Sequence, residues 1–349
     1  MVRDKKYWGY IEEIGKRIIT HMPNGKCKFM LSGASGMVGT VLIDTILFLN
    51  DTFGRKYEVI GLGRSREHMD EMFGSYDGRD DFQYKLCDIN DRIPQCGDVD
   101  YIIHCASNTH PLDYSGDPIG TITSNVIGTN NLLKYYVDNH CKRFVFLSSV
   151  EVYGENRGDV DGMKEEYLGY INCNTMRAGY PESKRTGEAL CCAYGKKHNV
   201  DFVIPRLCRT FGPTMSLRDS KAIAQFIKKA AQNEDIVLKS EGKQLFSYID
   251  VFQAVYAILY ILSRGECANA YNVSSSNGEW YMRDIAEKLA KKAGTNVVYD
   301  LPDKTEKEGY SIATKAILDN SKLKGIGWEE YIDCEEVLYY TVDVLKCRI

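Results

Sequence analysis

Three glycines at regular spacing constrain the fold of this chain more than any other feature. Gly33, Gly36 and Gly39 follow an apolar run and stand at the start of a helical pattern, Val38–Leu49. Glycines permit a tight turn, let the backbone approach a pyrophosphate and let helix and strand pack closely. The N-terminus of the next helix offers free N–H groups to phosphate. The residues expected to contact a dinucleotide here are Gly33, Ser35, Gly36, Met37 and Gly39.

Strand-like and helical patterns alternate along the chain as far as residue 207. Helical periodicity between the apolar runs is clearest at Ser124–Asn139 and Glu182–His198. Strands that alternate with helices predict an α/β fold, here a Rossmann-type doubly wound parallel sheet with helices on both faces. The predicted strands are Cys27–Ser32, Tyr57–Leu62, Phe82–Leu86, Val99–Cys105, Arg143–Ser148 and Val200–Leu207.

The pattern changes after Gly212 and Pro213, where helices begin to predominate. We expect a smaller, mixed α/β C-terminal lobe that binds the substrate and comprises residues 205–245 and 273–349. The dinucleotide domain would comprise residues 27–204, and the chain would return to it at 246–272. Residues 1–26 are expected to form a helical extension, whose amphipathic segment packs on the body of the protein or on a partner. The helices predicted outside the dinucleotide core are Tyr7–Ile19, Ala222–Gln232, Ala254–Leu262, Met282–Ala293 and Cys334–Leu345.

Composition argues against several classes of protein. The net charge is -4 and there is no long basic run, so nucleic acid is not expected as a partner. No segment reaches the roughly 18 apolar residues that span a bilayer, and the N-terminus lacks the apolar core of a signal peptide. The 12 cysteines are dispersed and contain no Cys-x-x-Cys motif, which argues against a metal site. These features together favour a cytoplasmic protein with reduced cysteines.

Tyr180 and Lys184 stand four residues apart in a predicted helix and therefore share one face. A phenol has an ordinary pKa of about 10, and a nearby ammonium favours its ionisation to a base. Ser149 ends a predicted strand and would hydrogen-bond the substrate hydroxyl that Tyr180 deprotonates. Lys184 would also hold the nicotinamide ribose. Taken alone the tyrosine–lysine pair fits a solvated helix face, but together with the serine and the glycine turn it predicts a hydride-transfer site.

The choice between NAD and NADP depends on the residue that follows the second predicted strand. An acidic side chain there usually holds the ribose hydroxyls of NAD, whereas this chain has Arg64, which favours the 2′-phosphate of NADP. A solvated surface arginine is the alternative. Asp88, after the third predicted strand, would meet the adenine edge or serve only as a turn residue.

The order of these motifs resembles the extended short-chain dehydrogenase/reductase family, which contains nucleotide-sugar epimerases, dehydratases and decarboxylases. The resemblance covers residues 27–345 and includes further motifs at 104–107, 125–129, 205–213, 246–251 and 321–328. It implies a nucleotide-diphosphate sugar as substrate. It also implies a homodimer through a four-helix contact of Ser124–Asn139 and Glu182–His198. Further cofactor contacts that it implies are Asp88, Ile89, Cys105, Ala106, Ser107, Asn125, Tyr180 and Lys184.

Within that family, residues 111–119 and 148–153 are most similar to UDP-glucuronate decarboxylases and 4,6-dehydratases. Both groups carry a glutamate at the position of Glu151, which implies a catalytic carboxylate after C4 is oxidised to a ketone. A dehydratase then loses water from C5 and C6, and a decarboxylase loses carbon dioxide from a β-keto acid. A 4-epimerase or a reductase is the alternative enzyme. A non-catalytic dinucleotide-sensing regulator is the alternative of another class.

Several positions depart from the family pattern. Val150 stands where dehydratases have an aspartate acid and decarboxylases a serine, and Gln244 replaces an arginine that binds the diphosphate. Arg209 replaces an asparagine and is expected to supply the positive charge that Gln244 lacks. The arginine pair of decarboxylases is missing near Tyr310–Lys315. These changes predict a substrate unlike the common ones.

Overall fold

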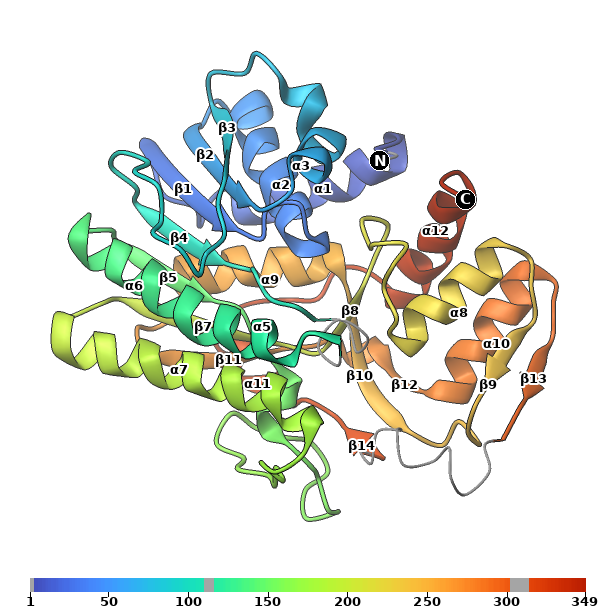
Figure 1. The fold of residues 1–349 in the computed structure, drawn as a ribbon. Coiled ribbons are helices and arrows are strands. Elements are labelled where there is room, and N and C mark those ends of the chain that lie inside the picture. The colour runs from blue at the N-terminus through green and yellow to red at the C-terminus, as the bar shows by residue number, and fades with distance from the viewer. Residues whose placement is uncertain (1–2, 110–115, 302–313) are drawn as a thin grey trace.

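Parallel strands form the centre of the protein, in the order β11-β7-β5-β4-β1-β2-β3, with β6 paired to β7. A computed structural model describes residues 3–109, 116–301 and 314–349 (Figure 1). The order reverses between β1 and β4, where a doubly wound sheet opens a crevice for a ligand. The strands are β1 (Lys26–Ser32), β2 (Lys56–Gly63), β3 (Phe82–Leu86), β4 (Tyr101–His104), β5 (Arg143–Phe146), β6 (Ser148–Ser149), β7 (Phe202–Leu207) and β11 (Asn269–Val273). The sheet confirms the predicted Rossmann-type fold.

Helices cover both faces of this sheet because alternate residues of each strand are apolar on opposite sides. In β1, Phe29 and Leu31 pack into one core cluster, and Met30 packs into the other. The first cluster also takes residues from α1 (Lys5–Ile18), α2 (Met37–Phe53), α3 (Arg66–Phe73) and α9 (Val251–Arg264). The second takes residues from α6 (Thr129–Asp138) and α7 (Gly179–His198), and the short α5 (Pro118–Thr123) lies against α7 (Figure 1).

The N-terminal helix α1 packs on the body of the protein, against α2 and α9. Its apolar residues recur at helical spacing, and Ile11, Ile14 and Ile18 are fully buried. Tyr7 donates a hydrogen bond to the buried carboxylate of Asp44 over 2.5 Å. The amphipathic helix predicted near the N-terminus is therefore present, and it packs on the first sheet's helical layer.

A smaller lobe is built on mixed strands after β7. It contains β8 (Arg209–Phe211), β10 (Leu245–Asp250), β12 (Glu279–Tyr281) and β14 (Lys315–Ala316) in one sheet, and β9 (Ile236–Leu238) with β13 (Val297–Tyr299) in another. Its helices are α8 (Ala222–Ala231), α10 (Met282–Ala293), α11 (Ser321–Gly325) and α12 (Cys334–Lys346). The segment 246–272 is shared: β10 lies in this lobe, whereas α9 and β11 pack in the first sheet's layers.

Two predicted elements are interrupted. The helix predicted over Ser124–Asn139 begins with a π turn, Ser124–Gly128, and the Thr129 hydroxyl that follows it donates to the carbonyl of Asn125 over 2.5 Å. The strand predicted over Arg143–Ser148 divides at Leu147, whose carbonyl accepts the ammonium of Lys184. Both interruptions lie beside the predicted catalytic helix.

Short elements were not recognised from the sequence. Helix α3 has a clear capping signal at Ser65, whose hydroxyl accepts the N–H of His68, but its eight residues are mostly polar. The strands β8, β9, β12, β13 and β14 are two or three residues long, too short to show a period. Within the described ranges, we find no helix with the length and apolar character needed to cross a bilayer.

Candidate active site

The glycine turn lies at the carboxyl edge of the sheet, between β1 and α2. Gly33 has φ +68, and a Cβ atom there would lie 2.7 Å from the backbone nitrogen of Ala106. A Cβ atom on Gly39 would lie 2.4 Å from the carbonyl oxygen of Gly33. Both positions therefore require glycine, one for its backbone angle and one for the close packing of helix on strand.

The N-terminus of α2 begins at this turn with Gly36 as its capping residue. Gly36 is exposed, and no side chain of the described residues caps the first N–H groups of the helix. An uncapped helix start beside a glycine cradle fits the pyrophosphate of a dinucleotide. Ser35 and Met37 are half-buried beside it, and the carbonyl of Met37 accepts the Thr214 hydroxyl over 3.0 Å. That bond connects the turn to the segment that enters the smaller lobe.

The predicted adenosine contacts lie on the neighbouring strand ends. Arg64 follows β2 and is exposed. Asp88 accepts the N–H of Asn90 over 2.9 Å, so its carboxylate supports a turn in this structure. Ile89 is buried and packs so closely on Gly128 that a Cβ atom there would lie 2.4 Å from the Ile89 side chain.

A buried histidine connects β1, β4 and the helix that follows β4. His104 shares hydrogen bonds with Ser32 over 2.7 Å and with Thr129 over 3.0 Å. Complete burial, reinforced by the charge of Lys184, lowers the pKa of His104 well below its usual range, so the ring is neutral. The next residues are fixed as well: the N–H of Cys105 bonds the Ser32 carbonyl, and that of Ala106 bonds the Ser32 hydroxyl.

A chain of neutral hydrogen bonds leads from the end of β4 to the catalytic helix. Ser107 donates to the amide oxygen of Asn125 over 2.8 Å, and Asn125 donates to Ser183 over 2.9 Å. Ser183 in turn donates to the backbone carbonyl of Tyr180 over 2.9 Å. Asn125 and Ser183 are buried, so this chain fixes the helix start relative to the sheet.

Tyr180 and Lys184 lie at the start of α7 and are both buried, with 9% and 2% of their surface exposed. The Lys184 ammonium donates to the Leu147 carbonyl over 2.8 Å and lies 4.9 Å from the centre of the Phe146 ring. Burial lowers the pKa of Lys184 to about 8. A buried cation one turn from a phenol stabilises the phenolate more strongly than a solvated one does.

Ser149 ends β6 at the same edge of the sheet. Its side-chain oxygen accepts the N–H of Glu151 over 3.3 Å and caps the short 3-10 helix Val150–Tyr153. The side chain is half-buried. Capping fixes the oxygen beside the strand end without consuming the hydroxyl proton, which remains available for a substrate oxygen.

The residues after Ser149 have contrasting environments. Val150 is buried in the main core cluster, whereas 52% of the Glu151 side chain is exposed. Arg209 forms an ion pair with Glu151 across 3.8 Å and stacks on the Phe246 ring, 3.6 Å from its centre. One Arg209 nitrogen, Nη1, is buried and makes no hydrogen bond within the described residues. An orphaned buried guanidinium donor is costly unless a ligand supplies the acceptor.

Gln244 precedes β10 and is engaged locally. Its amide group exchanges hydrogen bonds with the Ser240 hydroxyl over 3.2 Å. Arg209 pairs in register with Tyr248 of β10 and covers Phe246, so the arginine lies over the same strand that Gln244 begins. Of the segment 310–315, where the arginine pair of decarboxylases is missing from the sequence, residues 310–313 lie outside the described residues, as do 111–115 of the motif at 111–119.

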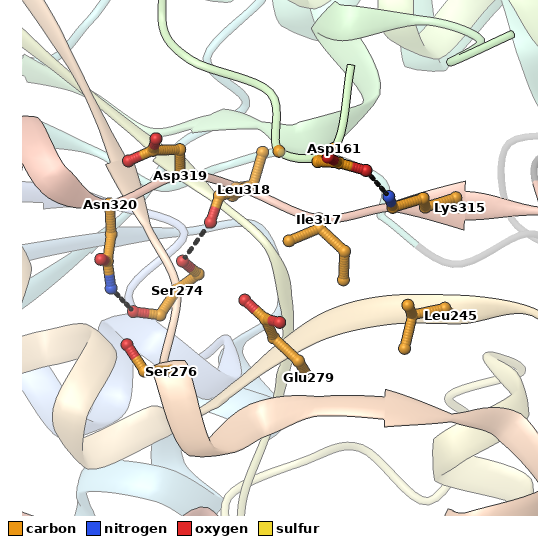
Figure 2. Close-up of a pocket in the computed structure, with 11 residues that line it drawn as sticks. Asp161, Leu245, Ser274, Ser276, Glu279, Lys315, Ile317, Leu318, Asp319 and Asn320 are labelled. Carbon is orange, nitrogen blue, oxygen red and sulfur yellow. Dashed lines mark hydrogen bonds and ion pairs between the residues drawn. The ribbon is translucent and has the colours of Figure 1, made fainter. Parts of the chain in front are cut away.

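Sequence reasoning missed a buried ion pair behind this site. Glu188 of α7 and Arg206 of β7 meet at 2.7 Å, and Ser148 donates to Glu188 over 2.5 Å. The spacing of Glu188 from Lys184 places both on one helix face and was the available signal. Sequence reasoning also missed a pocket of about 420 Å³ that is lined by the ion pair of Lys315 with Asp161 (Figure 2). None of the predicted site residues lines that pocket.

Comparisons with known proteins give the family of this chain. Residues 29–274 match the family described as NAD dependent epimerase/dehydratase family. UDP-glucuronic acid decarboxylase 1 of Xenopus tropicalis is 27% identical over 326 residues, which cover 91% of this chain and 72% of that protein. UDP-glucuronic acid decarboxylase 3 of Arabidopsis thaliana is 27% identical over 323 residues, with coverage of 92% and 90%.

Solved structures show the same fold at lower identity. A dTDP-glucose 4,6-dehydratase of Streptomyces venezuelae with NAD bound has a TM-score of 0.76 at 21% identity, covering 91% of this chain and 97% of that one. A UDP-glucuronic acid 4-epimerase of Bacillus cereus, in complex with UDP-glucuronic acid and NAD, has a TM-score of 0.77 at 19% identity, with coverage of 92% and 100%. The family match spans more than half of the chain, and this protein therefore belongs to the NAD dependent epimerase/dehydratase family.

Proposed function

We propose that this protein is an NAD(P)-dependent enzyme that oxidises a nucleotide-diphosphate sugar at C4 and then decarboxylates it. One contrast carries the choice of the second step. Val150 is apolar and buried where a dehydratase needs an acid, whereas Arg209 offers a cation with an orphaned donor beside Glu151. Loss of carbon dioxide requires no proton for a leaving hydroxyl, and the relatives named as UDP-glucuronic acid decarboxylases support that choice.

The chain's own residues perform the first step as follows. Ser149 orients the C4 hydroxyl, and Tyr180, as phenolate, takes its proton. Lys184 stabilises the phenolate and holds the ribose next to the nicotinamide. A dinucleotide held by the glycine turn and Lys184 would supply the hydride chemistry at C4. Such a cycle would leave the cofactor in its starting oxidation state.

The second step follows from the C4 ketone. A C5 carboxylate is then part of a β-keto acid, so the bond from C5 to the carboxyl carbon breaks and its electron pair becomes the enolate of the ketone. A proton must then reach C5, and Glu151 is the nearby side chain that we assign to that transfer. Arg209 binds the substrate diphosphate in place of the arginine that Gln244 replaces. We assign residues 205–245 and 273–349 to the substrate lobe.

The proposed cofactor site combines the glycine turn with the ends of the neighbouring strands. Its fit rests on the uncapped start of α2 and on the two positions that exclude a Cβ atom. NAD is bound in several similar structures, and the exposed Arg64 favours NADP for this chain. The proposed contacts are Gly33, Ser35, Gly36, Met37, Gly39, Arg64, Asp88, Ile89, Cys105, Ala106, Ser107, Asn125, Tyr180 and Lys184.

A 4-epimerase is the second candidate, because Ser149, Tyr180 and Lys184 suffice for oxidation and return of hydride on the other face. Mass spectrometry after incubation with a panel of nucleotide sugars separates the candidates. We expect a product lighter by one carbon dioxide from a nucleotide uronate. A product lighter by one water would indicate a dehydratase, and an isomer of unchanged mass an epimerase. Absence of conversion with cofactor bound would contradict the enzyme assignment.

We propose a homodimer formed through the helices of the second core cluster. Three isoleucines there are exposed to solvent, with exposed fractions of 74% for Ile119, 41% for Ile122 and 43% for Ile127. They lie on α5 and the π turn, next to α7. A cluster of exposed isoleucines fits an apolar contact with a second copy. Sedimentation of Ile122→Glu, expected as a monomer beside a dimeric wild type, tests the contact.

We also propose a reducing, cytoplasmic setting for the protein. The 12 cysteines all carry free thiols, and eight of them are at least partly buried. Buried thiols behave as small apolar side chains in a reducing compartment. Titration with a thiol reagent after denaturation should find all of the thiols free in protein isolated from its native source.

A further inference from the structure

Two contacts from α7 hold the strand that carries Ser149. The Lys184 ammonium donates to the Leu147 carbonyl over 2.8 Å, and the Ser148 hydroxyl donates to the Glu188 carboxylate over 2.5 Å. Lys184 and Glu188 are four residues apart and therefore lie one helical turn from each other on the same face. This face of α7 thus fixes the two residues directly before Ser149.

The carboxylate of Glu188 is paired with an arginine. Arg206 of β7 binds both oxygens of Glu188, with Nε 3.0 Å from one and Nη2 2.7 Å from the other. The two side chains are only 14% and 13% exposed. Such a planar, two-bond pair is specific to arginine and a carboxylate. Lys184 therefore keeps a neutral carbonyl as its partner.

Arg206 is itself held on its far side. Its Nη1 donates to the Tyr153 hydroxyl over 2.9 Å and to the Glu165 carbonyl over 2.7 Å. Tyr153 donates onward to Asn272 of β11 over 2.5 Å. The guanidinium is consequently fixed from β7, β11 and the loop around Glu165, and Glu188 has one defined orientation.

The titratable groups that face Lys184 differ in charge. Burial raises the pKa of Cys105 to about 12 and that of Cys191 well above its usual range, and it lowers that of His104, so these groups are neutral. Glu188 is the carboxylate among the groups that act on Lys184. Arg206 and Tyr153 lie behind it, and the Phe146 ring contacts the ammonium from β5.

We propose that Glu188, held by Arg206, is a positioning residue for the oxidation step: it fixes the strand before Ser149 and leaves the Lys184 ammonium free for the phenolate and the ribose. The inference rests on the proposed function, because it takes Ser149, Tyr180 and Lys184 as the reacting set. The charges of Glu188 and Arg206 balance each other. Loss of the Glu188 charge should therefore make the potential at Lys184 more positive, and loss of the Arg206 charge should make it more negative.

Paired substitutions test the balance through the pH dependence of kcat/KM. Glu188→Gln leaves Arg206 uncompensated, so Lys184 loses its proton more readily and the alkaline limb should move to lower pH by about one unit. Arg206→Gln leaves Glu188 uncompensated beside Lys184, and the same limb should move to higher pH by about as much. Arg206→Lys keeps the charge and loses the two-bond geometry, so kcat should fall while the alkaline limb of the pH profile stays at the same pH.

Two further variants separate the charge effect from general damage. Ser148→Ala removes the bond to Glu188 but no charge, so kcat should fall about tenfold with KM and the pH profile unchanged. Arg143→Gln breaks a comparable two-bond pair with Asp201, 2.9 and 3.0 Å long, at the start of β5. That control should lower the melting temperature and leave the pH profile in place.

Opposite shifts in the Glu188 and Arg206 variants support the proposal, and shifts of one sign, or none, overturn it. If Arg206→Gln does not fold, Glu188→Gln decides alone, because it keeps the size of the side chain. Calorimetric titration of NAD against pH gives a second readout, since the Lys184 ammonium is proposed to hold the ribose. If the wild type turns over no nucleotide sugar, the proposed function fails. The pH dependence of NAD affinity, measured by calorimetry in the Glu188 and Arg206 variants, still tests the charge arrangement.

Discussion

The cofactor side and the substrate side of the candidate site are built from different materials. The cofactor side consists of backbone turns, glycines and buried neutral groups, such as the bonds of Asn125 to Ser107 and Ser183. The substrate side relies on long charged side chains that are partly exposed, above all Glu151 and Arg209. Backbone geometry changes little between relatives, whereas one side-chain replacement alters a charged surface. The first side therefore carries the pattern of the family, and we propose that the second determines the product.

The largest expected effect tests the part that both sides share. Tyr180→Phe removes the phenol that takes the substrate proton, so kcat should fall by about 1,000-fold or more. Affinity for the dinucleotide should stay within about twofold, because the ring and the glycine turn remain. Stopped-flow turnover and calorimetric cofactor binding measure the two quantities. Appreciable turnover by this variant would exclude Tyr180 as the base. The cofactor side and the substrate side would then no longer share this residue.

Loss of Arg209 tests whether the substrate side depends on single charges. Arg209→Ala should weaken binding of a nucleotide sugar by about 100-fold, since a partly buried, charge-assisted contact contributes about 2–3 kcal/mol. The free nucleoside diphosphate should lose as much affinity if the arginine binds the diphosphate. Cofactor affinity should not change. Isothermal titration of each ligand makes the measurement.

A matched control exists in the same lobe. Arg283 also stacks on an aromatic ring, 5.0 Å from the centre of Tyr281, but its side chain is 44% exposed. Arg283→Ala should leave nucleotide-sugar affinity within about twofold, because exposed charged contacts contribute little. Equal losses in the two variants would mean that general positive charge, and not the orphaned donor of Arg209, attracts the substrate.

The Lys184 ammonium shows what the cofactor side costs in stability. Its pKa falls from 10.5 to about 8 on burial, which corresponds to about 3 kcal/mol against the charged form at neutral pH. The pKa of Lys184 is lower in the folded state, about 8, than in the unfolded state, 10.5. The folded state is therefore relatively more stable at pH above 10.5, and this stability is lost as the pH falls through 8. Lys184→Met should therefore be more stable than the wild type at pH 7, by about 1–3 kcal/mol after loss of the bond to Leu147.

Chemical denaturation across pH measures this difference. The stability gap between Lys184→Met and the wild type should be largest below pH 8 and should narrow as pH rises toward 10.5. The same variant should lose nearly all turnover. A gap that stays constant with pH would show that the lysine is not strained by burial and that its charge has no special role in the site.

Sequence reasoning succeeded where local pattern and long-range structure agree. Each of three signals arises within a single local segment: the glycine turn, the apolar pattern of each strand, and the spacing of Tyr180 and Lys184. A parallel sheet then brings the carboxyl ends of its strands to the same edge. Reasoning failed where the decisive contact joins distant elements. Arg206 and Glu188 are 18 positions apart on different elements, and no period in the sequence relates them.

The substrate side could be reached only as a set of departures from a family pattern. Val150, Gln244 and Arg209 were recognisable as unusual, but their environments were not. The structure shows Val150 inside the core, Gln244 bonded to Ser240, and Arg209 stacked on Phe246, with Nη1 unpaired among residues 3–109, 116–301 and 314–349. Such environments arise from packing between β8, β10 and the 3-10 helix, which a linear pattern does not encode.

The smallest expected effect concerns Arg64, the one exposed charge that we assign to the cofactor side. If it binds the 2′-phosphate, Arg64→Ala should reduce the preference for NADP over NAD by about tenfold, a contribution of about 1.4 kcal/mol at an exposed site. The loss should shrink as salt is raised, because exposed charges are screened. Affinities of both dinucleotides at two salt concentrations measure it, with Arg66→Ala, an exposed neighbour bonded to Tyr84, as the control. An unchanged ratio would make Arg64 a solvated surface residue. The cofactor side would then bind its ligand through backbone geometry and neutral groups, with no exposed charge, and would differ still more clearly from the charged substrate side.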